Sequence, residues 1–182
     1  KRGLAERWDV ERDEVFGGGG SSLTLMQTLL TYCWLFPLPG NDKPWGQQGE
    51  VKFLCPVPGY DRHFAATNHL GIVNIPVPMD DNGPDMDAVE KLVANDASIK
   101  GMWCVPKYAN PTGVTYGDET VRRLAAMKTA APDFRICWDN AYAVHALAET
   151  GERLLPLLPA PTDAGNPNRA LLFAPLPQVT SG

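Results

Sequence analysis

Residues 101–113 read GMWCVPKYANPTG, a strand-like apolar run that ends in a polar turn. Residues 134–142 read FRICWDNAY and repeat this arrangement, with Asp139 directly after the apolar residues. Ligands of open α/β sheets bind outside the carboxyl ends of parallel strands, so polar residues after two such strands can meet at one small molecule. The two stretches therefore predict an α/β sheet with a ligand site at its carboxyl edge.

Other runs of the chain continue the same alternation of strands and helices. Strands are expected at residues 51–55, 72–76, 101–105, 134–138 and 170–174. Helices are expected at residues 22–36, 61–70, 86–95 and 118–130, the last with Asp118 as its N-cap. The segments 37–49 and 156–167 are rich in proline and glycine and are expected to be surface loops. This order predicts a three-layer α/β/α domain with a mostly parallel sheet.

The composition is that of one globular domain. The chain has 182 residues, of which 44% are hydrophobic and 20% are charged. A net charge of -5 with scattered signs gives no basic stripe for nucleic acid. No apolar run approaches the roughly 20 residues of a membrane span. We therefore expect a cytoplasmic protein without nucleic-acid or membrane partners.

Cysteine, histidine and lysine residues give little sign of a metal or disulfide site. The four cysteines lie far apart without C-x-x-C spacing, and the three histidines show no ligand spacing. Buried free thiols and structural histidines are the expected outcome, with no bound metal. Five lysines are expected to be surface charges: Lys43, Lys52, Lys91, Lys100 and Lys128.

Four motifs stand in a fixed order along the chain. They are KFLCPVPGYDRHF at 52–64, GPDMD at 83–87, VPKYANPTG at 105–113 and WDNAYAVH at 138–145. Together they resemble the fold-type I pyridoxal-phosphate-dependent aminotransferases, closest to the bacterial aspartate or MocR-like aminotransferase group. The resemblance covers residues 17–180, and it implies that residues 1–182 form a partial cofactor-binding large domain, with the small domain absent.

The resemblance implies a role for four polar or aromatic side chains. Asp139 would lie against the pyridine nitrogen of the cofactor and keep it protonated, so that the ring can withdraw electrons. Asn110 and Tyr142 would hydrogen-bond the phenolic oxygen, and Tyr60 would stack on the ring. A cis Asn110-Pro111 bond is also implied. Taken one at a time, such residues more commonly form turns, a helix cap and packed rings.

The glycine run at residues 17–20, followed by Ser21 and Ser22, precedes a predicted helix. Glycines let the backbone approach an anion, and the helix N-terminus attracts it, so this run is a candidate phosphate cradle. A flexible loop is the alternative. The corresponding family loop carries Gly-Asn-Ser-Ser, so Gly20 departs from it, while Gly19 and Ser21 match.

The position of the cofactor-linked lysine differs from the family pattern. The family segment Ser-Thr-Ser-Lys corresponds here to residues 175–178, where Gln178 stands in place of the Schiff-base lysine. Glutamine has no basic amine and cannot form an imine, so no intact catalytic residue is expected. Lys107 lies near the rim of the expected site and is interpreted as a substrate or loop contact, or as a solvated side chain.

Two functions of different classes follow. The first is a pyridoxal-phosphate-dependent aminotransferase, a homodimer in its complete form, that exchanges amino groups between an amino acid such as aspartate and a 2-oxo acid. This chain would then be a fragment, through truncation, a damaged reading frame or gene decay. The second is a non-catalytic cofactor-binding or assembly module. A nucleotide-binding domain that uses the glycine run is disfavoured, because no G-x-G-x-x-G follows a clear strand.

Overall fold

The computed structural model describes residues 21–141 and 159–174. Within these ranges, six strands form one sheet in the order β3-β2-β1-β4-β5-β6. All neighbouring strands are parallel except β2 and β3, which are antiparallel. The strands are β1 (Lys52–Val57), β2 (Val73–Asp80), β3 (Gly83–Pro84), β4 (Ile99–Cys104), β5 (Arg135–Asp139) and β6 (Ala170–Phe173).

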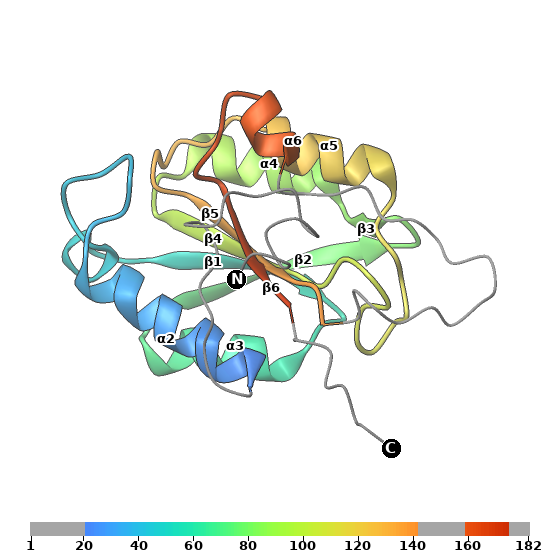
Figure 1. Ribbon diagram of the computed structural model, residues 1–182, viewed down its shortest axis with the longest axis horizontal. Helices are drawn as coiled ribbons and strands as arrows, with labels where there is room; N and C mark the ends of the chain where they lie inside the picture. Colours follow the sequence, from blue (N-terminus) through green and yellow to red (C-terminus); the bar gives the residue numbers. More distant parts are fainter. Residues whose placement is uncertain (1–20, 142–158, 175–182) are drawn as a thin grey trace, which may run out of the picture.

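Helices cover both faces of this sheet. They are α2 (Ser22–Leu35), α3 (Asp61–His69), α4 (Met86–Asn95), α5 (Asp118–Ala126), α6 (Pro159–Asp163) and the 3-10 helix η2 (Trp45–Gln47). Figure 1 shows α2 and α3 on one side of the sheet and α4, α5 and α6 on the other. The predicted three-layer α/β/α architecture with a mostly parallel sheet is therefore confirmed.

Side chains of successive strand residues alternate between the two helix layers, as the pleat requires. In β1, Phe53 packs into the core that contains α2 residues, whereas Leu54 packs into the core beneath α4 and α5. Trp103 of β4 joins the first core and Met102 joins the second. Every residue of β4 and β5 is buried, as expected for central strands of a sheet covered on both faces.

The helix α5 begins and ends differently from the prediction. Its N-cap is Gly117, and Asp118 is the first helical residue, where its charge favours the helix N-terminus. The helix ends at Ala126 rather than at residue 130, since the backbone at Met127 leaves the helical region. The guanidinium of Arg169 donates to the carbonyls of Ala125 and Met127, which satisfies backbone groups left free at this end.

Two predicted surface loops contain ordered structure. The segment 37–49 includes η2, and the indole of Trp45 within it is buried against the α2 side of the sheet. The segment 156–167 includes the short helix α6. The proline and glycine content indicated the turns correctly. It did not indicate that Trp45 is buried, because a single tryptophan can anchor such a loop in the core.

Lysine and cysteine positions test the expectations about charge and thiols. Lys100 was expected at the surface, which is wrong: it is buried in β4, and its Nζ donates to Asp133 Oδ1 at 2.9 Å. A central strand places this residue in the interior, where a charge requires a partner. The four cysteines are buried free thiols, as predicted.

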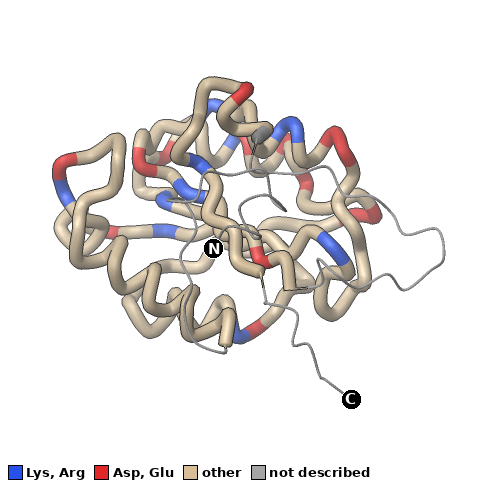
Figure 2. Tube along the Cα trace, in the orientation of Figure 1, with Lys and Arg blue, Asp and Glu red and all other residues tan. Residues whose placement is uncertain are grey.

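Charged residues of both signs are interspersed along the trace, as Figure 2 shows. None of the helices in the described ranges is long and apolar enough to cross a bilayer.

Candidate functional site

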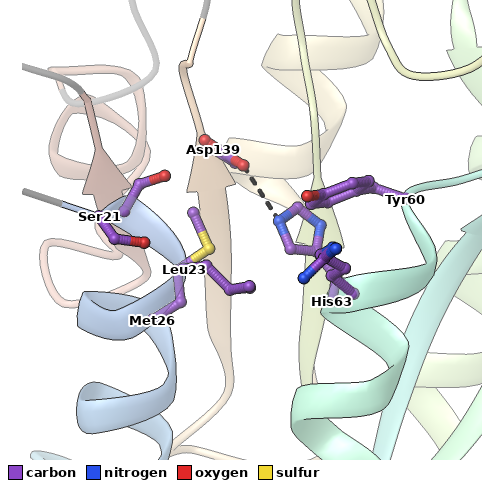
Figure 3. Close-up of a pocket in the computed structure, with 8 residues that line it drawn as sticks. Ser21, Leu23, Met26, Tyr60, His63 and Asp139 are labelled. Carbon is purple, nitrogen blue, oxygen red and sulfur yellow. Dashed lines mark hydrogen bonds and ion pairs between the residues drawn. The ribbon is translucent and has the colours of Figure 1, made fainter.

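A pocket of about 340 Å³ opens at the carboxyl end of β5. It is lined by Ser21, Ser22, Leu23, Met26, Tyr60, Arg62, His63 and Asp139. In Figure 3, Ser21 before α2 and Leu23 and Met26 of α2 lie on one side, and Tyr60 and His63 at the start of α3 lie on the other. Asp139 lies between the two groups. The structure thus brings together three predicted site residues, Ser21, Tyr60 and Asp139.

Asp139 is the last residue of β5 and is only 7% exposed. One carboxylate oxygen, Oδ2, accepts a hydrogen bond from His63 Nε2 at 3.0 Å. The other oxygen, Oδ1, is buried and has no hydrogen-bond partner among residues 21–141 and 159–174. Burying a carboxylate oxygen without a hydrogen bond costs free energy. Oδ1 is therefore suited to accept a hydrogen bond from a ligand in the pocket.

His63 is held between two aromatic rings. It lies in the first turn of α3, and its imidazole stacks on Trp103 with ring centroids 4.5 Å apart and an interplanar angle of 12°. Tyr60 meets the same imidazole edge-on at 5.0 Å. These contacts fix the orientation of the imidazole, so Nε2 is directed at Asp139 by packing as well as by the hydrogen bond.

The sequence interpretation of His63 as a structural residue missed its contact with Asp139. A usable signal was present, since His63 follows Tyr60 by three residues at a helix start, and its N–H donates to the Tyr60 carbonyl at 3.1 Å. Residues three apart at a helix start lie on one face, so a candidate site residue at Tyr60 points to His63 as its neighbour.

Ser21 caps the amino end of α2. Its hydroxyl accepts from the Thr24 N–H at 3.5 Å, and its carbonyl accepts from the Leu25 N–H at 3.2 Å. The N–H groups of Ser22 and Leu23 precede these bonds and have no partner within the helix, as at any helix N-terminus. This end of a 14-residue helix attracts an anion. Gly19 and Gly20 lie outside the described residues.

Asn110 and Lys107 lie on the loop after β4. Asn110 is exposed and its bond to Pro111 is cis, as the resemblance implied. Lys107 Nζ lies over the Tyr108 ring, 5.1 Å from its centroid. Neither Asn110 nor Lys107 is among the residues that line the pocket.

Asn110 and Asp139 nevertheless share one edge of the sheet, because Cys104 of β4 pairs with Trp138 of β5. Tyr142 and Gln178 lie outside the described residues, so the roles expected of these two positions stay predictions. The cofactor contact of Asn110 also stays a prediction, since Asn110 is not among the residues that line the pocket.

Comparisons with known proteins agree with this geometry. The family model described as aspartate amino-transferase matches residues 2–182. The chain is 47% identical over 177 residues to a Mycolicibacterium smegmatis protein described as an aminotransferase. It is 45% identical over 176 residues to an aspartate aminotransferase of Corynebacterium glutamicum.

Solved structures give the same result. A crystal structure of an aspartate transaminase from Corynebacterium glutamicum superposes with a TM-score of 0.88 at 45% identity, covering 94% of this chain and 40% of that one. The kynurenine aminotransferase of Pyrococcus horikoshii, at 18% identity and a TM-score of 0.72, shares the fold over 98% of this chain and 40% of that one.

The chain spans 41% and 40% of the lengths of the two relatives from Mycolicibacterium and Corynebacterium, and 97% of its own length takes part in each match. The family model, which matches residues 2–182, decides the assignment. The chain belongs to the aspartate aminotransferase family, and its fold is that of the fold-type I pyridoxal-phosphate enzymes.

Proposed function

We propose that this chain is the cofactor-binding part of a pyridoxal-phosphate-dependent aminotransferase, which moves an amino group between an amino acid and a 2-oxo acid. One observation carries the proposal. The carboxylate of Asp139 is buried at the pocket wall, His63 donates to one oxygen at 3.0 Å, and the other oxygen has no partner in the part of the chain that the structure describes. A buried carboxylate with one oxygen available is suited to pair with the protonated pyridine nitrogen of the cofactor.

The residues of the pocket fit pyridoxal phosphate. Asp139 Oδ1 would accept from the pyridine nitrogen, the Tyr60 ring would cover one face of the cofactor ring, and the amino end of α2 would hold the phosphate. When bound, the cofactor supplies an electron-withdrawing ring that stabilises negative charge at the α-carbon of the substrate.

Each of these side chains has a distinct part in the chemistry. Asp139 keeps the proton on the ring nitrogen, because a nearby negative charge favours the protonated form. His63 orients Asp139, and its own orientation is fixed by Trp103. Tyr60 excludes water from its side of the pocket. Asn110, on the loop after β4, and Tyr142, three residues after Asp139 in the sequence, are proposed to bind the phenolic oxygen.

Aspartate is the candidate substrate, on the strength of the Corynebacterium relative that bears this name at 45% identity. We further propose a cytoplasmic homodimer as the complete form, as the family resemblance implies.

A second candidate is a non-catalytic cofactor-binding or assembly module. It is favoured by Gln178, which stands where the resemblance places the Schiff-base lysine. The two candidates share the pocket and differ only in whether a lysine can link the cofactor covalently.

The first test measures equilibrium binding of pyridoxal phosphate to the complete protein. Asp139→Asn keeps a hydrogen-bond acceptor but removes the charge, so we expect cofactor binding to weaken roughly tenfold or more. Asp118→Asn is the matched control, because Asp118 is exposed on α5, which lies on the opposite face of the sheet from α2 and α3. Equal cofactor affinity in the Asp139 variant and in the control would contradict the proposed site.

The second test asks whether a lysine at position 178 makes the protein catalytic, since this is the point on which the two candidates differ. After incubation with pyridoxal phosphate and borohydride reduction, we expect the mass of the unmodified protein to show no covalent cofactor. Gln178→Lys should introduce both the covalent adduct and amino transfer. In that background, Asp139→Asn should lower amino transfer by about two orders of magnitude, the usual loss when one electrostatic partner of a reacting group is removed. An adduct mapped to Lys107 in the unmodified protein would show that position 178 is not the position of the cofactor-linked lysine.

A further inference from the structure

The loop that carries Asn110 is closed by two backbone hydrogen bonds. It joins β4 to α5. The Ala109 N–H donates to the Val114 carbonyl at 2.8 Å, which closes the turn around Asn110. The Tyr116 N–H donates to the Pro106 carbonyl at 2.8 Å, close to the point where the loop leaves β4. Asn110 therefore lies at the tip of a loop whose base is closed at Tyr116.

The side chain of Tyr116 connects this base to two strands. Tyr116 is 3% exposed, and its ring meets Trp138 of β5 edge-on, with centroids 5.8 Å apart and an interplanar angle of 86°. Its hydroxyl hydrogen-bonds the thiol of Cys104, the last residue of β4, and the backbone of Val105. Burial raises the pKa of Tyr116 well above its ordinary range, so the hydroxyl stays protonated. One buried side chain thus touches the carboxyl ends of both central strands.

Tyr116 lies on the other side of the sheet from the pocket. Trp138 directly precedes Asp139 in β5, and consecutive strand residues point to opposite faces. Tyr116 and Trp138 both belong to the core beneath α4 and α5, whereas Asp139 lines the pocket. Tyr116 is not among the pocket-lining residues, so it can act on a ligand there only through the loop that it closes.

We propose that Tyr116 is a positioning residue for Asn110. It fixes the loop after β4 relative to the end of β5, so that Asn110 can reach the phenolic oxygen of a cofactor whose ring nitrogen Asp139 holds. Asn110 is exposed and Tyr116 is buried, so the packing that fixes the loop is at Tyr116. Hydrogen bonds weaken steeply when distance or angle departs from the optimum, so a small shift of the loop would cost the contact. This inference rests on the proposed function.

Two forms of the cofactor test this role without requiring turnover. Pyridoxal phosphate has the phenolic oxygen and its 3-deoxy analogue lacks it, while both have the ring nitrogen and the phosphate. Their dissociation constants would be measured by equilibrium dialysis on the complete protein. The phenolic preference is the constant of the analogue divided by that of pyridoxal phosphate. We expect at least about tenfold for the unchanged protein, the usual effect of hydrogen bonds to a charged oxygen.

Replacing Tyr116 should lower the phenolic preference. Tyr116→Leu removes the ring and the hydroxyl, and we expect a fall of about three- to tenfold, the loss of one hydrogen bond. Tyr116→Phe keeps the ring on Trp138 and should lower the preference only about twofold. The matched control is Phe134→Leu, because Phe134 is 2% exposed in the same core but directly precedes β5, at its other end. It should lower the thermal midpoint and leave the preference unchanged.

A double variant shows whether Tyr116 acts through Asn110. We expect Asn110→Ala alone to lower the phenolic preference about three- to tenfold, as Tyr116→Leu does. Adding Tyr116→Leu to Asn110→Ala should lower it no further, because the contact that Tyr116 positions is already absent.

Three results would overturn the inference: an unchanged preference in the Tyr116 variants, an equal fall in Phe134→Leu, or a further fall in the double variant. If Tyr116→Leu does not fold, Tyr116→Phe alone decides the first of these. No phenolic preference in the unchanged protein would also overturn the inference, while the proposed function would stand if Asp139→Asn still weakens cofactor binding. Binding of neither compound would refute the proposed function and this inference with it.

Discussion

At the scale of single residues, the candidate site depends on a contact between two side chains 76 positions apart in the chain. His63 Nε2 donates to Asp139 Oδ2, and the imidazole lies between Tyr60 and Trp103. A carboxylate with one oxygen fixed can present the other oxygen in a single direction. His63 is therefore a positioning residue for Asp139, whereas Asp139 is proposed to touch the cofactor.

Replacing His63 tests this positioning role. His63→Phe keeps a ring to stack on Trp103 but removes the donor to Asp139, so we expect pyridoxal phosphate affinity to fall about tenfold. His63→Gln keeps a donor and should recover most of that affinity. Cofactor titration of both variants, with thermal midpoints measured alongside, checks the expectation. A loss of affinity that follows the thermal midpoint and is not recovered by glutamine would mean that His63 acts only in packing.

At the scale of elements, the central strands support the site from beneath. Phe53 of β1 packs against Trp103 of β4 with ring centroids 5.4 Å apart, and Trp103 in turn stacks on His63. The Phe53 ring occupies the space above Gly101, where any Cβ would overlap it and would lie 2.9 Å from the Arg135 carbonyl oxygen. The absence of a side chain at Gly101 thus allows the Phe53 ring that supports Trp103 to pack directly against β4.

Adding a methyl group at Gly101 should therefore disturb this packing. We expect Gly101→Ala to lower the free energy of unfolding by about 1–3 kcal/mol, the usual cost of overfilling a packed core. The measurement is urea unfolding of the complete protein. Gly117→Ala is the reference, because a Cβ there comes no closer than 3.4 Å to Asn82; since Gly117 is the N-cap of α5, we expect a smaller loss of about 0.5–1 kcal/mol. Equal stability of the two variants would show that Phe53 can move aside freely.

At the scale of the whole molecule, the two cores enclose every cysteine of the chain. Burial raises the pKa of the Cys33 thiol to about 11 and that of Cys55 to about 12. Burial also raises the pKa values of Cys104 and Cys137 well above the ordinary range of a thiol. Thiolate is the reactive form, and an unfolded thiol has a pKa of about 8.5, so folding suppresses the reactivity of all four.

Thiol labelling at about pH 8 checks this protection. We expect mass spectrometry of the folded protein to show no modification at the four cysteines by a thiol reagent on a timescale that labels a free peptide thiol completely. In urea all four should react. Rapid labelling of Cys33 in the folded protein would indicate that α2 separates from the sheet and exposes the interior beside it.

The sequence by itself determined the order of elements and the residues at the carboxyl ends of the strands. Alternation of apolar and polar runs is a local property, so the strands around Trp103 and Trp138 and the helices between them could be predicted to within a few residues. Asp139 could be recognised for the same reason, since it follows directly on a buried strand. The short β3, the end of α5 and the helix α6 were missed, because they depend on contacts with distant residues.

Only the tertiary structure decided which side chains meet. The strand order β3-β2-β1-β4-β5-β6 brings the segment after β1 next to the end of β5, and so places His63 and Arg62 beside Asp139. The same order buries Lys100 against Asp133, where local polarity indicated the surface. Burial and pairing of these charges are set by neighbours that are remote in the chain, and the local composition around each residue carries no record of them.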